Sequence, residues 1–191
     1  MPVRNSDAGP ATLREATAAD APAIAALHAE SWRTTYRGAL RDDYLDGDIL
    51  GERTAVWRTR LDSPAANQRV VVAEERGRVI GFTCAYGEDD ARWGTQLDNI
   101  HVDRAAHGRG TGTCLVAGVA AWCRVAHPGG SGLYLWVLEQ NHPARRFYER
   151  LGATDQEGDV WLPPDGGEVK TRRYVWSRDE LARLAAHGRA R

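Results

Sequence analysis

One strand–loop–helix–strand segment in the middle of the chain constrains the fold more than any other. It begins with an expected strand over Leu97–Val102, passes through a loop with three glycines at 108, 110 and 112, and enters a pattern of helical spacing over Gly112–Ala126. Leu133–Leu138 follows and is apolar at every position, as expected of a strand covered on both faces. A strand, a helix and a second strand in this order form a right-handed crossover, so we predict that the two strands run parallel.

Turn and capping signals predict the other elements. Glu75–Arg78 separates two β-branched stretches, which indicates an antiparallel hairpin. Capping boxes at Thr17–Asp20 and Ser177–Glu180 mark the beginnings of the first and last helices. We expect strands over Thr12–Ala16, Arg69–Glu74, Val79–Tyr86, Val160–Leu162 and Val169–Trp176. Helices are expected to end near Trp32, Leu151 and Ala186, and a broken helical stretch is expected over Leu40–Leu61. Loops are expected over Trp32–Gly38 and Gly87–Gly94. The fold class is therefore α/β, with a mixed sheet.

The composition is that of one globular domain. With 191 residues, 42% hydrophobic and 27% charged, disordered, collagen-like and coiled-coil chains are excluded. The length suits a single domain. We expect residues 1–10 to be a flexible N-terminus, residues 11–177 to form the domain, and residues 178–191 to form a C-terminal helix and tail.

Charge and cysteine usage limit the partners. The net charge is -1 and no run of five like charges occurs, so neither a nucleic acid nor a membrane is expected as a partner. The longest apolar run is half of the roughly 20 residues that a membrane span needs. Three cysteines without CxxC spacing favour reduced thiols, and the N-terminus lacks an apolar signal core. We therefore expect a cytoplasmic protein, and the spacing of its histidines and cysteines predicts no metal site.

The glycine loop is suited to a phosphate group. Glycines let the backbone approach a ligand, and the free N–H groups at a helix start favour an anion. The dinucleotide-binding pattern fails in both possible registers, because Thr113 and Leu115 stand where it needs Gly or Ala. The nucleotide-binding P-loop fails because the only lysine, Lys170, is far from the loop in sequence. By itself the loop is also compatible with a plain strand-to-helix turn.

A third pattern fits better. The stretch His107–Gly112 is similar to the Gln/Arg-x-x-Gly-x-Gly/Ala loop of acetyl-CoA-dependent N-acetyltransferases, except that His107 replaces Gln or Arg. About 40 residues later, Asn141 ends an apolar strand and the next helix carries Phe-Tyr-Glu-Arg-Leu-Gly over 147–152. Together these features resemble the GNAT superfamily of acyl-CoA-dependent N-acetyltransferases, strongly over 97–152 and in element order over 12–176. The resemblance implies a mixed, mostly antiparallel sheet of six to seven strands flanked by helices, with a central parallel pair that splays apart.

The resemblance also implies acetyl-CoA as co-substrate, without a metal. The pantetheine arm would pair with the strand backbone, the pyrophosphate would lie on the glycine loop, and two further residues would lie beside the cofactor. The residues implied are Ile100, His101 and Val102 for the arm, His107, Gly108, Arg109, Gly110, Thr111, Gly112 and Thr113 for the pyrophosphate, and Asn141 and Tyr148 beside the cofactor. Because His107 replaces the usual Gln or Arg, one side-chain contact to a phosphate is left open. The expected backbone cradle does not depend on this side chain.

Acetyl transfer to an amine needs a base and is helped by an acid that protonates the leaving sulfur. By resemblance Tyr148 is the acid, although it could also be a core aromatic; Phe147 is expected on the core face and Tyr148 away from it. By resemblance Asp98 is the base. Along a strand Gln96, Asp98 and Ile100 share one face, and a carboxylate among apolar neighbours could take up a proton near neutral pH. His101 on the opposite face, or water, is the alternative base.

The acceptor is expected to be a small-molecule primary amine. By resemblance Trp32, Tyr36 and Arg37 line its pocket, where the aromatics could cover a cation and the arginine could hold a carboxylate. Trp32 and Tyr36 could instead simply pack the end of the helix. A non-catalytic acyl-CoA-binding or sensing module is the alternative function, and the missing lysine disfavours a nucleotide phosphotransferase. Strands near Val169–Trp176 could pair across a homodimer.

Overall fold

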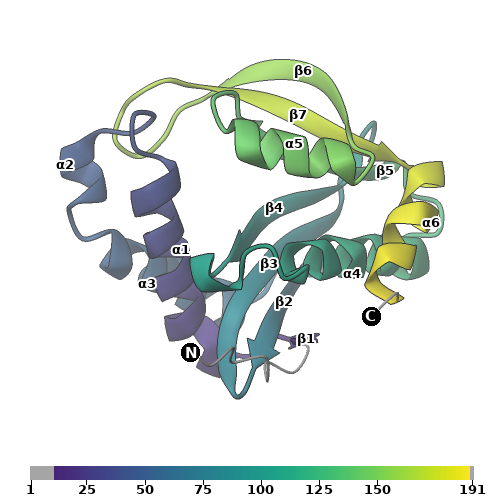
Figure 1. The fold of residues 1–191 in the computed structure, drawn as a ribbon, viewed down its shortest axis with the longest axis horizontal. Coiled ribbons are helices and arrows are strands. Elements are labelled where there is room, and N and C mark those ends of the chain that lie inside the picture. The colour runs from purple at the N-terminus through teal and green to yellow at the C-terminus, as the bar shows by residue number, and fades with distance from the viewer. Residues whose placement is uncertain (1–10, 190–191) are drawn as a thin grey trace, which may run out of the picture.

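The computed structural model describes residues 11–189 and contains one sheet of seven strands in the order β1-β2-β3-β4-β5-β7-β6 (Figure 1). The strands are β1 (Thr12–Glu15), β2 (Gln68–Glu75), β3 (Arg78–Asp90), β4 (Gly94–Val102), β5 (Gly132–Leu138), β6 (Thr154–Trp161) and β7 (Val169–Ser177). Neighbouring strands are antiparallel except β4 and β5, which are parallel. The predicted mixed, mostly antiparallel sheet with one central parallel pair is confirmed.

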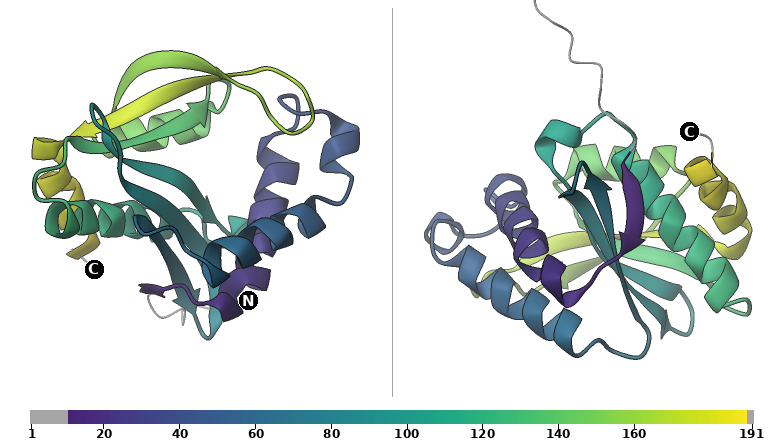
Figure 2. Two further views of the ribbon diagram at one scale, coloured as in Figure 1. Left: turned by 180° about the vertical axis from the view of Figure 1, so that it is seen from behind. Right: turned by 90° about the horizontal axis from the view of Figure 1, so that it is seen from below.

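Helices cover both faces of this sheet. They are α1 (Ala21–Thr35), α2 (Asp42–Leu45), α3 (Ile49–Asp62), α4 (Thr111–Ala126), α5 (His142–Arg150) and α6 (Arg178–Ala186). Figure 2 shows α1 and α3 on one side of β2, β3 and β4, with α4 on the other side. The core divides in the same way, since Trp57 of α3 packs with Phe82 whereas Leu115 of α4 packs with Ile80. The last helix, α6, packs against the same core cluster as α4 through Leu181 and Leu184.

The parallel pair is joined only at one end. The strands β4 and β5 pair at Thr95 with Leu133 and at Gln96 with Tyr134, and no further pairs follow. Beyond this point the two strands diverge, as Figure 1 shows. The backbone edge of Leu97–Val102 that faces β5 therefore has no strand partner, which confirms the predicted splaying of the central pair.

A β-bulge in β4 changes the faces of its side chains. Cys84 of β3 pairs with Asn99 and Ala85 pairs with Leu97, so Asp98 is an extra residue between two pairs. As a result Asp98 and Asn99 point to the same side, and one nitrogen of Arg60 donates to both, at 2.7 and 2.9 Å. Ile100 instead packs with the cluster on the α4 side. The prediction that Asp98 shares a face with Ile100 was wrong, because it assumed unbroken alternation.

Several boundaries also differ from prediction. Helix α1 continues to Thr35 instead of ending near Trp32, because the Trp32 ring is buried and keeps the last turn packed. The predicted loop Gly87–Gly94 is mostly strand, since β3 extends to Asp90 and β4 begins at Gly94. Strand β6 is longer than the predicted Val160–Leu162. Both predicted capping boxes are confirmed. Residues 1–10, expected to be flexible, lie outside the described residues.

Candidate active site

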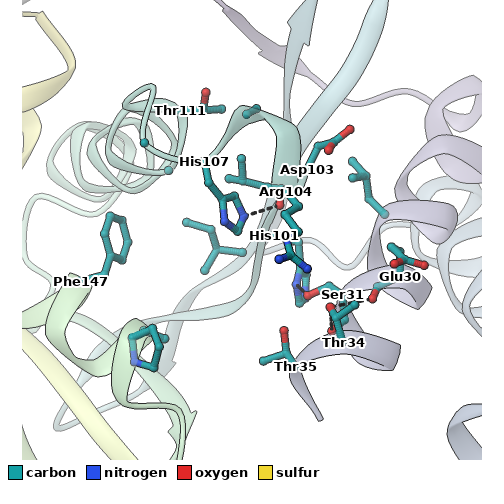
Figure 3. Close-up of a pocket in the computed structure, with 18 of the residues that line it drawn as sticks. Glu30, Ser31, Thr34, Thr35, His101, Asp103, Arg104, His107, Thr111 and Phe147 are labelled. Atoms are coloured by element: carbon teal, nitrogen blue, oxygen red, sulfur yellow. Dashed lines mark hydrogen bonds between the residues drawn. The ribbon is translucent and has the colours of Figure 1, made fainter. Parts of the chain in front are cut away.

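A cleft of about 1440 Å³ opens where β4 and β5 diverge (Figure 3). Its walls are helix α1, the end of β4 with the glycine loop and the start of α4, and helix α5. It exceeds the ~300–1,000 Å³ typical of small-molecule sites. The predicted site residues that line it are Arg37, Ile100, His101, Val102, His107, Gly108, Gly110, Thr111, Gly112, Thr113, Asn141 and Tyr148. Trp32, Tyr36, Asp98 and Arg109 are not among its lining residues.

The glycine loop presents backbone amides to this cleft. Gly108 and Gly110 have φ of +75° and +83°, a left-handed backbone that glycine adopts without steric cost. Gly110 is the N-cap of α4, so the helix begins at Thr111 and its first N–H groups lie at the cleft wall. Such unpaired N–H groups and the helix dipole attract an anion. The loop therefore has the backbone geometry of a phosphate cradle.

Two side chains of the loop are held by contacts within the protein. The Nε2 atom of His107 donates a hydrogen bond to the carbonyl oxygen of Val102 at 3.0 Å, drawn as a dashed line in Figure 3. Arg109 forms an ion pair with Glu75 at the end of β2. The His107 imidazole therefore connects the loop to the strand before it, while Arg109 connects the loop to the β2–β3 hairpin.

Helix α5 closes the cleft opposite α1. Asn141 is its N-cap, and the side-chain oxygen accepts a hydrogen bond from the Ala144 N–H at 3.2 Å. The Phe147 ring reaches the glycine loop, since a Cβ added at Gly112 would lie 3.3 Å from its Cζ atom. Gly112 thus allows the start of α4 to lie close to α5.

Tyr148 is more buried than its neighbour. It is 8% exposed and packs in the core cluster with Trp176, whereas Phe147 is half-buried. The prediction that Phe147 alone takes the core face was wrong; both rings line the cleft. Burial, with a smaller effect of nearby Tyr36, raises the pKa of the Tyr148 phenol above its ordinary value. The phenol is therefore protonated at neutral pH and can donate a proton.

Asp98 lies in an environment that the sequence did not predict. Its carboxylate is 2.7 Å from the Arg60 guanidinium, which in turn lies over the rings of Trp57 and Tyr86 at 5.2 and 5.8 Å. Burial disfavours the charge of Arg60, but Asp98, Cys84 and Tyr86 together outweigh this effect and raise the pKa of the guanidinium. The expected apolar neighbours of Asp98 are thus replaced by an ion pair, outside the cleft lining.

His101 is held beside a second imidazole. Its Nδ1 atom is hydrogen-bonded to Ser31 Oγ at 2.7 Å, and its ring lies 4.7 Å from that of His28 and 5.3 Å from that of Phe82. Burial lowers the pKa of His101 to about 4. Burial also lowers the pKa of His28, strongly, and the Nδ1 atom of His28 accepts a hydrogen bond from Trp57 Nε1 at 2.9 Å. Both imidazoles are therefore neutral at physiological pH.

Sequence reasoning did not identify Ser31 or His28 as site residues. The only available signal is their spacing, since positions three apart lie on the same face of a helix. That spacing places both on the face of α1 that packs against β4, where Ser31 meets a residue 70 positions later in the chain. Nothing local to either residue indicates this contact.

The predicted acceptor residues form a packed aromatic group near the end of α1. Trp32 is 6% exposed, and its ring stacks on Tyr36 at 5.1 Å and meets Trp161 edge-on at 5.9 Å. The Arg53 guanidinium covers Trp32 at 4.3 Å. Arg37 is held by Asp42 and Asp46. The burial of Trp32 favours a packing role for that ring, and of these predicted residues Arg37 alone lines the cleft.

The comparisons with known proteins agree with this geometry. The model of the Acetyltransferase (GNAT) family matches residues 24–153. The chain belongs to the GNAT acetyltransferase family. The uncharacterized N-acetyltransferase YuaI of Bacillus subtilis is 31% identical over 141 residues, which cover 72% of this chain and 77% of YuaI. This GNAT chain is accordingly an acetyltransferase, as the resemblance in its sequence implied.

Solved structures of the family share the fold. The paiA N-acetyltransferase of Thermoplasma acidophilum, in complex with coenzyme A, has a TM-score of 0.67 at 18% identity, over 88% of this chain and 100% of that one. The yncA protein of Salmonella typhimurium, solved with its cofactor acetyl-CoA, has a TM-score of 0.64 at 22% identity, over 90% and 96%. These likenesses confirm the GNAT fold.

The described part of this GNAT domain lacks two kinds of feature. Within residues 11–189, no helix is long and apolar enough to cross a bilayer. Over the same part of the chain, no group of three or more His, Cys, Asp or Glu residues is arranged to hold a metal ion.

Proposed function

We propose that this protein transfers the acetyl group of acetyl-CoA to a primary amine of a small molecule by direct attack. The observation that supports the proposal most is the split between β4 and β5, with the glycine loop at its end and Tyr148 in its wall. Two solved relatives of the same fold contain coenzyme A or acetyl-CoA.

The residues of the cleft fit coenzyme A. The amides over His107–Thr113 would bind the pyrophosphate, as free N–H groups at a helix start bind anions. The unpaired edge of β4 at Ile100, His101 and Val102 would pair with the amides of the pantetheine arm. The Val102 carbonyl already accepts one hydrogen bond from His107, so a second donor there would use its other lone pair. Asn141 would lie beside the arm at the start of α5.

In this proposal Tyr148 is the acid. Its buried phenol keeps its proton at neutral pH and donates it to the sulfur as the carbon–sulfur bond breaks. Backbone N–H groups of β4 would stabilise the negative charge that develops on the carbonyl oxygen. The amine loses a proton to a base, for which β4 offers Asp98, directly or through water, and His101.

The acceptor would approach from the α1 side of the cleft. Arg37 lines that side, and the Trp32–Tyr36 pair packs close behind it at the end of the same helix. Arg37 is already held by two carboxylates, so an acceptor carboxylate would compete with Asp42 and Asp46 for it. Trp32 and Tyr36 would act mainly by fixing the end of α1.

The proposal is tested by binding and by turnover. Coenzyme A and acetyl-CoA should each raise the melting temperature in a concentration-dependent way, because a ligand that binds only the folded state stabilises it. Thiol release from acetyl-CoA is then followed with spermidine, kanamycin, phenylalanine and an alanine-initiated tripeptide. Absence of any thermal shift would contradict the proposal. Binding without thiol release from any of the four amines would instead favour a non-catalytic acyl-CoA-binding module.

A further inference from the structure

We propose that His101 is the general base of the acetyl transfer and that Ser31 is the positioning residue that holds its ring. This inference rests on the proposed function above and assigns the proton acceptor that the proposed function leaves open. It combines a residue of β4 with a residue of α1, and Figure 3 shows the two side chains together at the cleft wall.

The first support is the fixed orientation of the ring. The His101 imidazole packs in one group with His28 and Phe82, at 4.7 and 5.3 Å between ring centres. Its Nδ1 atom is hydrogen-bonded to Ser31 Oγ at 2.7 Å. When the Nδ1 proton is donated to Oγ, the lone pair is on Nε2, the tautomer that can accept a proton there. In the proposed tautomer Nδ1 is the donor to Ser31, which leaves Nε2 as the base.

The second support is the charge around the ring. His28, the imidazole that packs beside His101, receives a hydrogen bond from Trp57 on Nδ1, so its own proton is on Nε2 and it is neutral. The environment that buries His101 keeps it neutral as well, with a pKa of about 4. The base is therefore unprotonated before the reaction.

The third support is the position of Asp98, the competing group. Its carboxylate is 2.7 Å from Arg60 and is not among the residues that line the cleft, whereas Ser31 and His101 both are. To act as a base, Asp98 would have to accept a proton while it is paired with the Arg60 guanidinium, whose side chain is only 28% exposed to solvent. The geometry favours the neutral imidazole over the paired carboxylate.

The resulting step balances as follows. The amine nitrogen attacks the thioester carbonyl, a carbon–nitrogen bond forms, and the amine proton moves to Nε2 of His101. The carbon–sulfur bond breaks as Tyr148 donates its proton to the sulfur. The proton on His101 then returns to the Tyr148 oxygen through solvent. The products are the acetamide and the free thiol of coenzyme A, with both side chains restored.

The experiment measures thiol release from acetyl-CoA with the four amines named above, using the full chain and four variants. His101→Ala should lower kcat by about 10²-fold or more, the usual contribution of a general base, with the Kd for coenzyme A nearly unchanged. Added imidazole should restore part of the rate, because the small base can occupy the space of the missing ring in an open cleft. A merely structural role of His101 would not give rescue by imidazole.

Ser31→Ala should lower kcat about tenfold, the scale of one hydrogen bond, while KM for acetyl-CoA stays unchanged. Thr34→Val is the matched comparison: it removes a hydroxyl from the same helix, but one bonded to the Glu30 carbonyl rather than to a histidine. Its effect on kcat should be smaller than that of Ser31→Ala. Asp98→Asn should lower kcat less than His101→Ala does.

The outcomes separate the two proposals. If the native chain releases no thiol with any of the four amines, the proposed function fails. If it does, but His101→Ala keeps its kcat or is not rescued by imidazole, the assignment of His101 is overturned. A larger loss in Asp98→Asn than in His101→Ala, with an unchanged melting temperature, would make the carboxylate the base. An equal loss in Ser31→Ala and Thr34→Val would remove Ser31 from its positioning role.

Discussion

The Nε2 atom of His107 lies 3.0 Å from the carbonyl oxygen of Val102, so the first residue of the glycine loop is bound to the last residue of the strand before it. At this position the family loop usually has Gln or Arg. In this chain the imidazole restrains the loop from within the protein, independently of any contact to a phosphate. This contact is the basis of the first prediction.

Replacing His107 by Ala should weaken coenzyme A binding by about three- to tenfold, since one hydrogen bond of ~0.5–1.5 kcal/mol no longer holds the cradle in place. The side chain is exposed, so the melting temperature without ligand should change little. His107→Gln keeps a donor of similar reach and should bind nearly as tightly as the native chain. Isothermal titration with coenzyme A measures both; equal affinities for all three proteins would contradict the prediction.

Gly110→Ala should destabilise the fold. Its φ of +83° is a conformation that costs a residue with a Cβ roughly 1–2 kcal/mol. Gly129→Ala is the control, because nothing lies within 4 Å of an added Cβ there and its backbone is not left-handed. Urea unfolding should therefore give a lower free energy of unfolding for the first variant and a change within ~0.5 kcal/mol for the second. Equal effects of the two variants would contradict this account of the loop.

Tyr148→Phe should slow turnover about 10²-fold while the Kd for coenzyme A stays within twofold of the native value. The substitution removes only the hydroxyl and keeps the ring that packs against Trp176. Single-turnover measurements of thiol release, paired with thermal titration by coenzyme A, separate the chemical step from binding. A variant that turns over at the native rate would exclude Tyr148 as the acid.

Stability should fall in mild acid. Burial lowers the pKa of both His28 and His101, the latter to about 4, while in the unfolded chain each titrates near 6.5. The unfolded state therefore binds more protons below pH 6.5, and the stabilisation that is complete above this value is lost as the pH falls towards 4. The free energy of unfolding should decrease by up to ~1.4 kcal/mol per pH unit for each histidine.

Urea unfolding between pH 4.5 and 8 measures this slope. His101→Asn removes one of the two titrating groups and should flatten the slope relative to the native chain. His142→Asn, the same substitution at an exposed histidine, is the matched control. A native slope that does not differ from that of His101→Asn would show that His101 does not couple folding to protonation.

The sequence was sufficient to predict the framework of the site. The order of Leu97–Val102, the glycine loop and Leu133–Leu138 determines a parallel crossover, because only a right-handed connection is common for such a unit. The capping boxes at Thr17 and Ser177 mark helix starts through local chemistry that needs no tertiary contact. Features that depend on neighbours in the sequence were therefore predictable.

Features that depend on distant packing were not. The bulge at Asp98 has one local signal, the adjacent polar pair Asp98–Asn99, but that pair does not show which residue is the extra one, so the faces of Asp98 and Ile100 were mistaken. The contact of Ser31 with His101 joins residues 70 positions apart. The relative burial of Phe147 and Tyr148 depends on where β7 lies, not on the helical spacing of α5.

The extra residue in β4 has a further effect on how polar groups are distributed. A regular strand can direct two of four consecutive side chains to one side, but between Asp98 and His101 three of four point towards α1 and α3, with Ile100 as the exception. One inserted residue thus places the polar side chains of the strand on one side of the sheet and leaves the apolar side chain on the side that faces α4. A short strand can in this way supply an apolar surface on one side and a row of hydrogen-bonding groups on the other. A single additional amino acid is sufficient to separate the two.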